Sequence, residues 1–406
     1  MKLNISLAER PAHVRPEQVV DFDFFGFDAA DGDSQWKMVS AFHSTSVPDV
    51  FWTPRNSGHW VAARADALEK VLTSPDLFSS SQFMVIKEMN PDPPLVPLML
   101  DAPDHSKYRS LLTGALSPGA VQKLSDRARA LAIELIESFV HKGACEFIGD
   151  FATHLPVTIF MSMVDWPMSD RSRLMEIAEL VVRPGSFEAA IAGKNLVDEY
   201  AQSVVATRRG TLGNDLISDL LRARVDGKPI PEQILNGMVK LLLTAGLDTV
   251  ASSMGFQARH LALSPELRAR LIAHPEIIPK AIEEMLRRFP IGNLGRKVTQ
   301  DCEFFGAQLK SGDTILAPTA SFGLDDRKFE SPDRVNVDRP AGFHLSFGAG
   351  PHRCVGAMLA RTELRIFVEE WLKRIPNFRI APGASINVAS GFVFGIPKLP
   401  LVWDVN

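Results

Sequence analysis

The chain has 406 residues, of which 46% are hydrophobic and 23% are charged. This is the composition of a folded protein with a large core, and it excludes a disordered chain, a collagen and a coiled coil. The 44 basic and 48 acidic side chains give a formal net charge of −4, which provides no general attraction for nucleic acid or an anionic membrane.

The N-terminal residues contain no apolar run of the kind found in signal peptides, so we expect a cytoplasmic protein without a membrane anchor. The three cysteines, Cys145, Cys302 and Cys354, are odd in number and show no CxxC spacing. They therefore favour neither a disulfide framework nor a structural zinc site, and they fit a reducing compartment.

The first hundred residues predict short strands and proline-rich turns. The run 60–63 (Trp-Val-Ala-Ala) has the residues of a strand. Segment 90–94 (Asn-Pro-Asp-Pro-Pro) predicts a loop, because proline lacks the backbone donor of a helix interior and restricts the residue before it.

Helices are predicted from about residue 101 to residue 288, where apolar residues recur mostly every three or four positions. One such series is Leu124, Ala128, Leu131, Leu135 and Phe139. The most apolar window, 238–256, predicts one long buried helix. It contains Lys240 and Asp248, and charges at the centre of a lipid-exposed helix disfavour a membrane span.

After Pro290 the pattern changes to short strands and turns, with 302–306 and 314–317 as candidate strands. One more helix is predicted over about 355–374, and the end of the chain, 392–403, predicts a β hairpin. No repeat, low-complexity tract or flexible linker divides the chain. The sequence thus predicts a single domain over residues 1–406 that is mainly α-helical with a minor β portion.

A glycine-rich segment, 347–356 (Phe-Gly-Ala-Gly-Pro-His-Arg-Cys-Val-Gly), brings Cys354 to the start of a helix. Unpaired backbone N–H groups and the positive end of the helix dipole favour a thiolate there. A thiolate can ligate a soft or borderline metal, and on haem iron it promotes cleavage of the O–O bond of dioxygen. By itself Cys354 is explained equally well as a small buried hydrophobic residue. A dinucleotide-binding fingerprint is a weak interpretation, because Arg353 stands where its third glycine belongs.

Two further motifs lie upstream of the cysteine. Glu284 and Arg287 share a helix face and can form a network that Arg339 completes, although an exposed ion pair is the alternative. Thr249 beside Asp248 is a candidate proton-relay alcohol, whereas a threonine alone more often bonds back to a helix carbonyl.

These three motifs together resemble those of the cytochrome P450 monooxygenases. The cysteine segment is similar to the family's haem-binding signature, 245–249 to its oxygen-activating segment and 284–287 to its ExxR pair, in family order. The resemblance implies a triangular helical domain that holds haem b (iron protoporphyrin IX) between the long central helix and the cysteine-loop helix. It also implies Cys354 as the iron ligand and Asp248 and Thr249 as catalytic residues. Further haem contacts implied by the resemblance come from Phe347, Gly348 and Gly356.

The two propionates of haem need cations at the porphyrin edge. By position relative to the motifs, the resemblance nominates His105, Arg109, Arg296 and His352. For each of these residues taken alone, an ordinary surface charge is the alternative.

Within the family, the likeness is to the bacterial camphor-hydroxylating enzymes, with two differences. Pro93 stands where those enzymes orient a ketone with a tyrosine hydroxyl, and Leu294 stands where they have an aspartate near a propionate. The missing donor predicts weak binding of camphor and a terpenoid or norisoprenoid-like substrate held by apolar contact, unless Thr244 replaces the hydroxyl. The substrate pocket implied by register comprises Met84, Pro93, Leu95, Leu98, Leu241, Thr244, Gly292, Leu294, Phe392 and Val393.

The resemblance implies a monooxygenase that uses O2 and two electrons from NAD(P)H. A [2Fe–2S] ferredoxin, reduced by a flavoprotein ferredoxin reductase, would deliver them and dock near Lys107, Arg109 and Arg353. A peroxide-driven peroxygenase is one alternative, against which the Asp248–Thr249 pair argues. A non-enzymatic haem sensor or carrier is the other.

Overall fold

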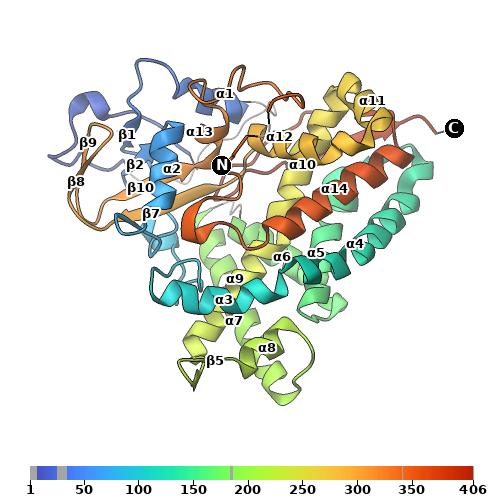
Figure 1. Ribbon diagram of the computed structural model, residues 1–406, viewed down its shortest axis with the longest axis horizontal. Coiled ribbons are helices and arrows are strands. Elements are labelled where there is room, and N and C mark those ends of the chain that lie inside the picture. The colour runs from blue at the N-terminus through green and yellow to red at the C-terminus, as the bar shows by residue number, and fades with distance from the viewer. Residues whose placement is uncertain (1–6, 25–33, 183–185, 341, 406) are drawn as a thin grey trace.

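The computed structural model of the chain describes residues 7–24, 34–182, 186–340 and 342–405, and it is mainly helical with a minor β portion, as predicted (Figure 1). Most of the labelled strands gather at the left of the view, and helices fill most of the right and the lower part (Figure 1). The helices are α1 (Ser34–Ala41), α2 (Ala65–Thr73), α3 (Asp104–Ala115), α4 (Pro118–Phe139), α5 (His154–Met163), α6 (Arg171–Val182), α7 (Phe187–Gly210), α8 (Leu216–Arg222), α9 (Glu232–Leu247), α10 (Thr249–Leu263), α11 (Pro265–Ala273), α12 (Ile278–Arg288), α13 (Thr319–Gly323) and α14 (Ala357–Arg374). The strands are β1 (Val50–Thr53), β2 (His59–Ala62), β3 (Phe78–Ser79), β4 (Ala144–Glu146), β5 (Arg224–Val225), β6 (Lys228–Pro229), β7 (Asn293–Val298), β8 (Cys302–Phe304), β9 (Ala307–Leu309), β10 (Thr314–Pro318), β11 (Phe378–Ile380) and β12 (Pro400–Trp403).

The largest sheet has five strands in the order β1-β2-β10-β7-β3. Strands β2 and β10 are parallel, and the other neighbours pair antiparallel. The strands predicted at 60–63, 302–306 and 314–317 are found as β2, β8 and β10, and the proline-rich segment 90–94 is a loop. The sheet places β7, which carries Arg296, beside the loop that contains Phe83, because the Gly295 N–H donates to the Phe83 carbonyl at 2.8 Å.

The predicted C-terminal hairpin over 392–403 is wrong. Strand β12 pairs with β11, which lies outside the predicted hairpin, and with β4, which lies far away in the sequence. Val393 instead forms an isolated bridge with Gly292, and the Phe392 carbonyl accepts from the Asn293 N–H at 3.0 Å. These partners come from distant segments, so the local alternation of residues does not reveal them.

Helix α4 confirms the predicted helical pattern, but its buried stripe is displaced from the predicted series. The buried residues are Val121, Ser125, Ala128, Ala132, Ile136 and Phe139. Small side chains at 128 and 132 face the core, where α4 packs against α14 and α5. Larger leucines of the predicted series, such as Leu124 and Leu131, are half-buried at the edge of this contact.

The long helix predicted over 238–256 is divided into α9 and α10, which meet at Asp248 with φ −124° and ψ −33°. By length and composition alone, the stretch Glu232–Leu263 could cross a membrane, and 56% of its most apolar window is buried inside the protein. Helix α9 contacts α5, α6 and α7, and α10 contacts α14. This is the packing of a core helix, and it brings Asp248 and Thr249 to the centre of the molecule.

Candidate active site

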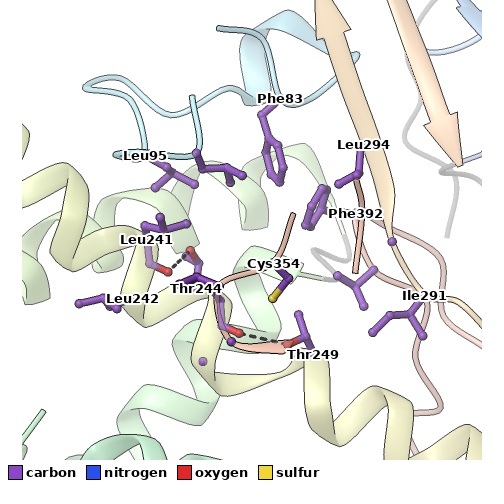
Figure 2. Close-up of a pocket in the computed structure, with 18 of the residues that line it drawn as sticks. Phe83, Leu95, Leu241, Leu242, Thr244, Thr249, Ile291, Leu294, Cys354 and Phe392 are labelled. Atoms are coloured by element: carbon purple, nitrogen blue, oxygen red, sulfur yellow. Dashed lines mark hydrogen bonds between the residues drawn. The ribbon is translucent and has the colours of Figure 1, made fainter. Parts of the chain in front are cut away.

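A cavity of about 420 Å³ lies between the α9–α10 pair and the segment that carries Cys354. The Cys354 side chain points into it, with Leu241, Thr244 and Thr249 along the helical wall (Figure 2). The loop that contains Phe83, the strand β7 and the segment around Phe392 complete the wall. Chain segments far apart in sequence therefore meet at one thiol.

The glycine-rich segment holds Cys354 through its backbone. The Cys354 N–H donates to the Phe347 carbonyl at 2.8 Å, which closes the loop around the thiol. Gly350 has φ +64°, and a Cβ there would lie 2.6 Å from the Leu72 carbonyl oxygen. Only glycine fits that position, because both the backbone conformation and the close approach exclude a side chain. A Cβ at Gly356 would lie 3.9 Å from the Cys354 sulfur, so this glycine keeps the backbone near the thiol.

Burial and nearby basic residues act in opposite directions on the Cys354 thiol. Burial raises the pKa of the thiol, and the Gly356 N–H together with Arg109, Arg353 and Arg361 lowers it without reversing the net upward direction. Helix α14 begins only at Ala357. A bound metal cation would add a positive charge that favours the thiolate.

Four basic side chains converge at the edge of the same cavity: His105, Arg109, Arg296 and His352. The imidazole rings of His105 and His352 lie 4.1 Å apart, and neither His105 Nε2 nor His352 Nδ1 has a hydrogen-bond partner among the described residues. Burial lowers the pKa of Arg296 to about 10, and burial together with the neighbouring Arg296, His105 and Arg109 lowers that of His352 to about 3. A buried guanidinium needs an anionic partner, and an unsatisfied ring nitrogen needs a hydrogen-bond partner. Two carboxylates, as haem propionates supply, fit this need.

The residues Asp248 and Thr249 occupy the break between α9 and α10. The Thr249 hydroxyl donates to the Ala245 carbonyl at 3.1 Å and lines the cavity. The Asp248 carboxylate is 6% exposed and accepts from the Ser252 hydroxyl at 2.9 Å. The backbone-bonded threonine is thus present in the geometry, and the Asp248 carboxylate is not among the described residues that line the cavity.

Gly246 lies two residues before the break, next to Phe160 on α5. A Cβ at Gly246 would lie 2.6 Å from the ring of Phe160 on α5. The glycine therefore accommodates the aromatic ring on a neighbouring helix, and it also lines the cavity.

Glu284 and Arg287 form a buried bidentate pair on α12. Arg287 Nε and Nη2 donate to the two carboxylate oxygens at 2.8 and 2.9 Å, and Arg339 Nε donates to Glu284 at 3.2 Å. Arg287 also donates to the carbonyls of Pro332 and Arg334, each at 2.8 Å. Burial alone would raise the pKa of Glu284, but these hydrogen bonds and charges lower it. The network fastens α12 to the segment that follows α13.

The sequence-predicted pocket residues lie around the cavity with one exception. Those that line it are Met84, Leu95, Leu98, Leu241, Thr244, Gly292, Leu294, Phe392 and Val393. Pro93 is not among the described lining residues, because its carbonyl is turned to Lys240 Nζ at 2.9 Å. The Thr244 hydroxyl donates to the Lys240 carbonyl at 3.0 Å, so it does not stand ready to replace the missing tyrosine donor.

Sequence reasoning missed several polar residues that line the cavity, among them Lys240, Asp198 and Glu363. Lys240 carried a signal, since it is a charge inside the most apolar window of the chain. Glu363 sits on α14 with 2% exposure, and its Oε1 has no hydrogen-bond partner among the described residues. Burial raises the pKa of Glu363 to about 8. The sequence around it reads as an ordinary amphipathic helix.

Comparisons with known proteins agree with this geometry. A family model described as cytochrome P450 matches residues 157–386. The probable cytochrome P450 127A1 of Sinorhizobium fredii is 32% identical over 97% of this chain and 96% of its own length. The crystal structure of CYP101J2 superposes with a TM-score of 0.88 at 35% identity, covering 98% of this chain and 100% of that chain. The crystal structure of CYP101C1 gives a TM-score of 0.86 at 34% identity, covering 98% and 100%.

The sequence matches extend over nearly the whole chain, and the fold and the residues that line the cavity are consistent with them. A thiol, a cluster of cations and a facing helix with an alcohol surround a space that fits haem b, the cofactor of this family. The chain belongs to the cytochrome P450 family, close to its CYP101 members, and is a haem-dependent monooxygenase.

Proposed function

We propose that the enzyme hydroxylates a small, mainly aliphatic substrate such as a terpenoid or a norisoprenoid. The observation that carries the proposal is the wall beside Thr249, which is built largely from branched apolar side chains. These are Leu95, Leu98, Leu241, Leu294 and Val393. Burial of apolar area then provides most of the binding free energy, at about 25 cal/mol per Å².

The proposal assigns Cys354 as the ligand of the haem iron. His105, Arg109, Arg296 and His352 would hold the propionates, and Phe347, Gly348 and Gly356 line the cavity beside the thiol. When bound, haem supplies the chemistry that activates O2 for insertion of one oxygen atom into a C–H bond. The protein provides the thiol, the basic side chains and a largely apolar space.

Thr249 and Asp248 are proposed to move protons toward the cavity. The Thr249 hydroxyl lines the cavity, while the Asp248 carboxylate accepts from Ser252 on the inner side of the helix. A hydroxyl can pass a proton only by accepting one as it donates another, and the break at Asp248 leaves this turn outside regular helical bonding.

Electrons are proposed to come from NAD(P)H through a flavoprotein reductase and a [2Fe–2S] ferredoxin in the cytoplasm. Of the basic residues expected at the docking face, Arg353 is exposed. Lys107 pairs with Asp226 at 2.8 Å and with Asp104 at 3.3 Å, and Arg109 turns inward to the Arg353 carbonyl. The docking charge therefore centres on Arg353 more than on Lys107.

We also propose that residues 1–406 form one domain. The buried hydrophobic residues form three clusters, and Leu241 and Leu294 each pack against two of them.

The proposal is tested by titrating the holoenzyme with a panel of terpenoids and norisoprenoids and following the haem Soret band. We expect a shift with elongated apolar members and a weak one with camphor. Tight camphor binding with a single hydroxylated product would contradict the pocket assignment.

Turnover by the Thr249→Ala variant separates a monooxygenase with this proton path from a peroxygenase. We expect NADH consumption to continue while electrons are diverted to hydrogen peroxide, and Thr249→Ser to restore coupling. Asp248→Asn should slow turnover itself. Unchanged coupling in Thr249→Ala would argue against the relay.

A further inference from the structure

We propose that Lys240 selects the substrate, by donating a hydrogen bond to a neutral carbonyl or hydroxyl oxygen at the end of the cavity remote from Thr249. The inference rests on the proposed function and refines its substrate class. Lys240 would supply the hydrogen-bond donor that is missing because Pro93 stands in place of a tyrosine hydroxyl.

The position of Lys240 is set by three elements. On α9, its side chain is 3% exposed, its Nζ donates to the Pro93 carbonyl at 2.9 Å, and it lies 2.6 Å from Asp198 Oδ1 on α7. One turn earlier, Gly237 lets the proline-rich loop approach, because a Cβ there would clash with the Pro94 carbonyl. The Val96 N–H also donates to the Gly237 carbonyl at 3.2 Å. Loop and helix are thus fastened to each other where the ammonium lies.

The ammonium retains donor capacity toward the cavity. It has three N–H bonds, and the Pro93 carbonyl and the Asp198 carboxylate are its only partners among the described residues. Both Lys240 and Asp198 line the cavity. The neighbouring Thr244 hydroxyl is committed to the Lys240 carbonyl, so the ammonium is the stronger donor on this face of α9.

The charges at this end favour a neutral ligand. The Lys240 ammonium faces the Asp198 carboxylate at 2.6 Å, so this pair carries no net charge. A carboxylate substrate would add an uncompensated negative charge beside Asp198. A ketone, aldehyde or alcohol oxygen accepts the hydrogen bond without this cost.

The spacing along the helix sets the shape of the substrate. Lys240 lies seven residues before Leu247, the last residue of α9, which corresponds to about 10 Å along the helix axis, and Thr249 begins α10. Aliphatic side chains, including Leu241, line the stretch between them. A molecule that reaches both ends must be elongated, with its oxygen at one end and the oxidised carbon at the other. A small bicyclic ketone is too short to use both.

The test compares an ionone with the hydrocarbon of the same carbon skeleton, by Soret titration of the holoenzyme. We expect the wild type to bind the ketone about ten-fold more tightly. In Lys240→Met, which keeps the apolar stem, the ratio of the two affinities should fall to about one, with hydrocarbon binding nearly unchanged. Thr244→Val is the matched control on the same helix face and should keep the ratio.

Asp198→Asn gives a second, independent readout if Lys240→Met does not fold. Removing the carboxylate leaves this end with a net positive charge, so the carboxylic acid analogue of the ionone should gain affinity by about ten-fold. The assignment of Lys240 would be overturned if the ratio of ketone to hydrocarbon affinity stayed unchanged in Lys240→Met or was lost in Thr244→Val. It would also be overturned if Asp198→Asn gained no affinity for the carboxylic acid analogue. Absence of any Soret shift with both ionone and hydrocarbon would overturn the proposed function itself, and the inference with it.

Discussion

Ionisable side chains around the cavity differ in whether the protein itself supplies a partner. Lys240 is paired with Asp198, and Arg287 with Glu284. His105, His352 and Glu363 each keep a buried polar atom without a hydrogen-bond partner among the described residues, and Arg109 and Arg296 donate to backbone carbonyls there. Charge buried without a partner is unfavourable. At such positions a bound molecule supplies the missing partner, or the pKa of the group shifts so that its charge is lost.

For Cys354 we expect Cys354→Ala to abolish the red-shifted Soret band that a thiolate-ligated haem shows when it is reduced under carbon monoxide. The physical reason is that no second thiol lines the described part of the cavity. Cys302→Ala is the control, because Cys302 lies on β8 away from this wall. Survival of the band in Cys354→Ala would refute the assignment.

For Glu363 we expect stability to fall with rising pH. Burial raises the pKa of its carboxyl from 4.5 to about 8, so the folded state holds a proton that the unfolded state releases. Stability is highest below pH 4.5 as far as this group is concerned, and it declines up to about pH 8, by about 1.4 kcal/mol per pH unit. Glu363→Gln should therefore be more stable than the wild type at pH 8, and nearly equal to it at pH 4, in thermal unfolding of the holoenzyme. Equal melting temperatures at both pH values would contradict this.

At the scale of elements, the junction of α9 and α10 depends on its contact with α5. Phe160 packs where Gly246 has no side chain, and Asp248 interrupts the helix two residues later. The helix ladder is thus broken beside the turn that carries Thr249. The contact with α5 keeps that turn in position.

We expect Gly246→Ala to destabilise the holoenzyme by about 1–3 kcal/mol, because the added methyl group overpacks the ring of Phe160. Phe160→Leu should relieve part of this loss in the double variant. Gly114→Ala is the matched control, since a Cβ at that position of α3 meets nothing within 4 Å; it should be neutral or slightly stabilising. Thermal unfolding gives the comparison, and equal melting temperatures for the two alanine variants would exclude the clash.

At the scale of the whole molecule, the Glu284 network joins the helical part to the segment that leads to the cysteine loop. Arg287 and Arg339 reach carbonyls between residues 323 and 334, and the Asn336 N–H donates to Glu284 at 2.9 Å. These contacts place the cysteine segment relative to α12. Loss of the network is therefore felt at the cavity as well as at α12.

We expect Glu284→Gln to lose about 3 kcal/mol at neutral pH, because Arg287 then keeps its charge in a buried place without a counter-charge. The folded-state pKa of Glu284 is lowered below 4.5, so its contribution is complete above that pH and is lost as pH falls through the folded value. The stability gap between variant and wild type should close in acid. Glu232→Gln, which removes an exposed partner of Arg209, should change stability by less than about 0.5 kcal/mol. A constant gap across pH would contradict the assignment.

The features that depend on neighbours in the chain could be predicted from the sequence alone. Helical periodicity, proline-rich loops and the cysteine segment are local patterns, and Glu284 with Arg287 share a face because a helix turn brings them together. Positions relative to the motifs of a known family also predicted the basic residues and most of the pocket residues that line the cavity.

The contacts between distant segments could be identified only from the folded structure. The pairing of β12 with β4, the ring of Phe160 against Gly246, and the contact of Lys240 with Pro93 and Asp198 join segments that no local pattern connects. The break at Asp248 is likewise invisible in an apolar run. The physical reason is that periodicity reports which face of an element is buried, whereas the partner of that face is set by the path of the whole backbone.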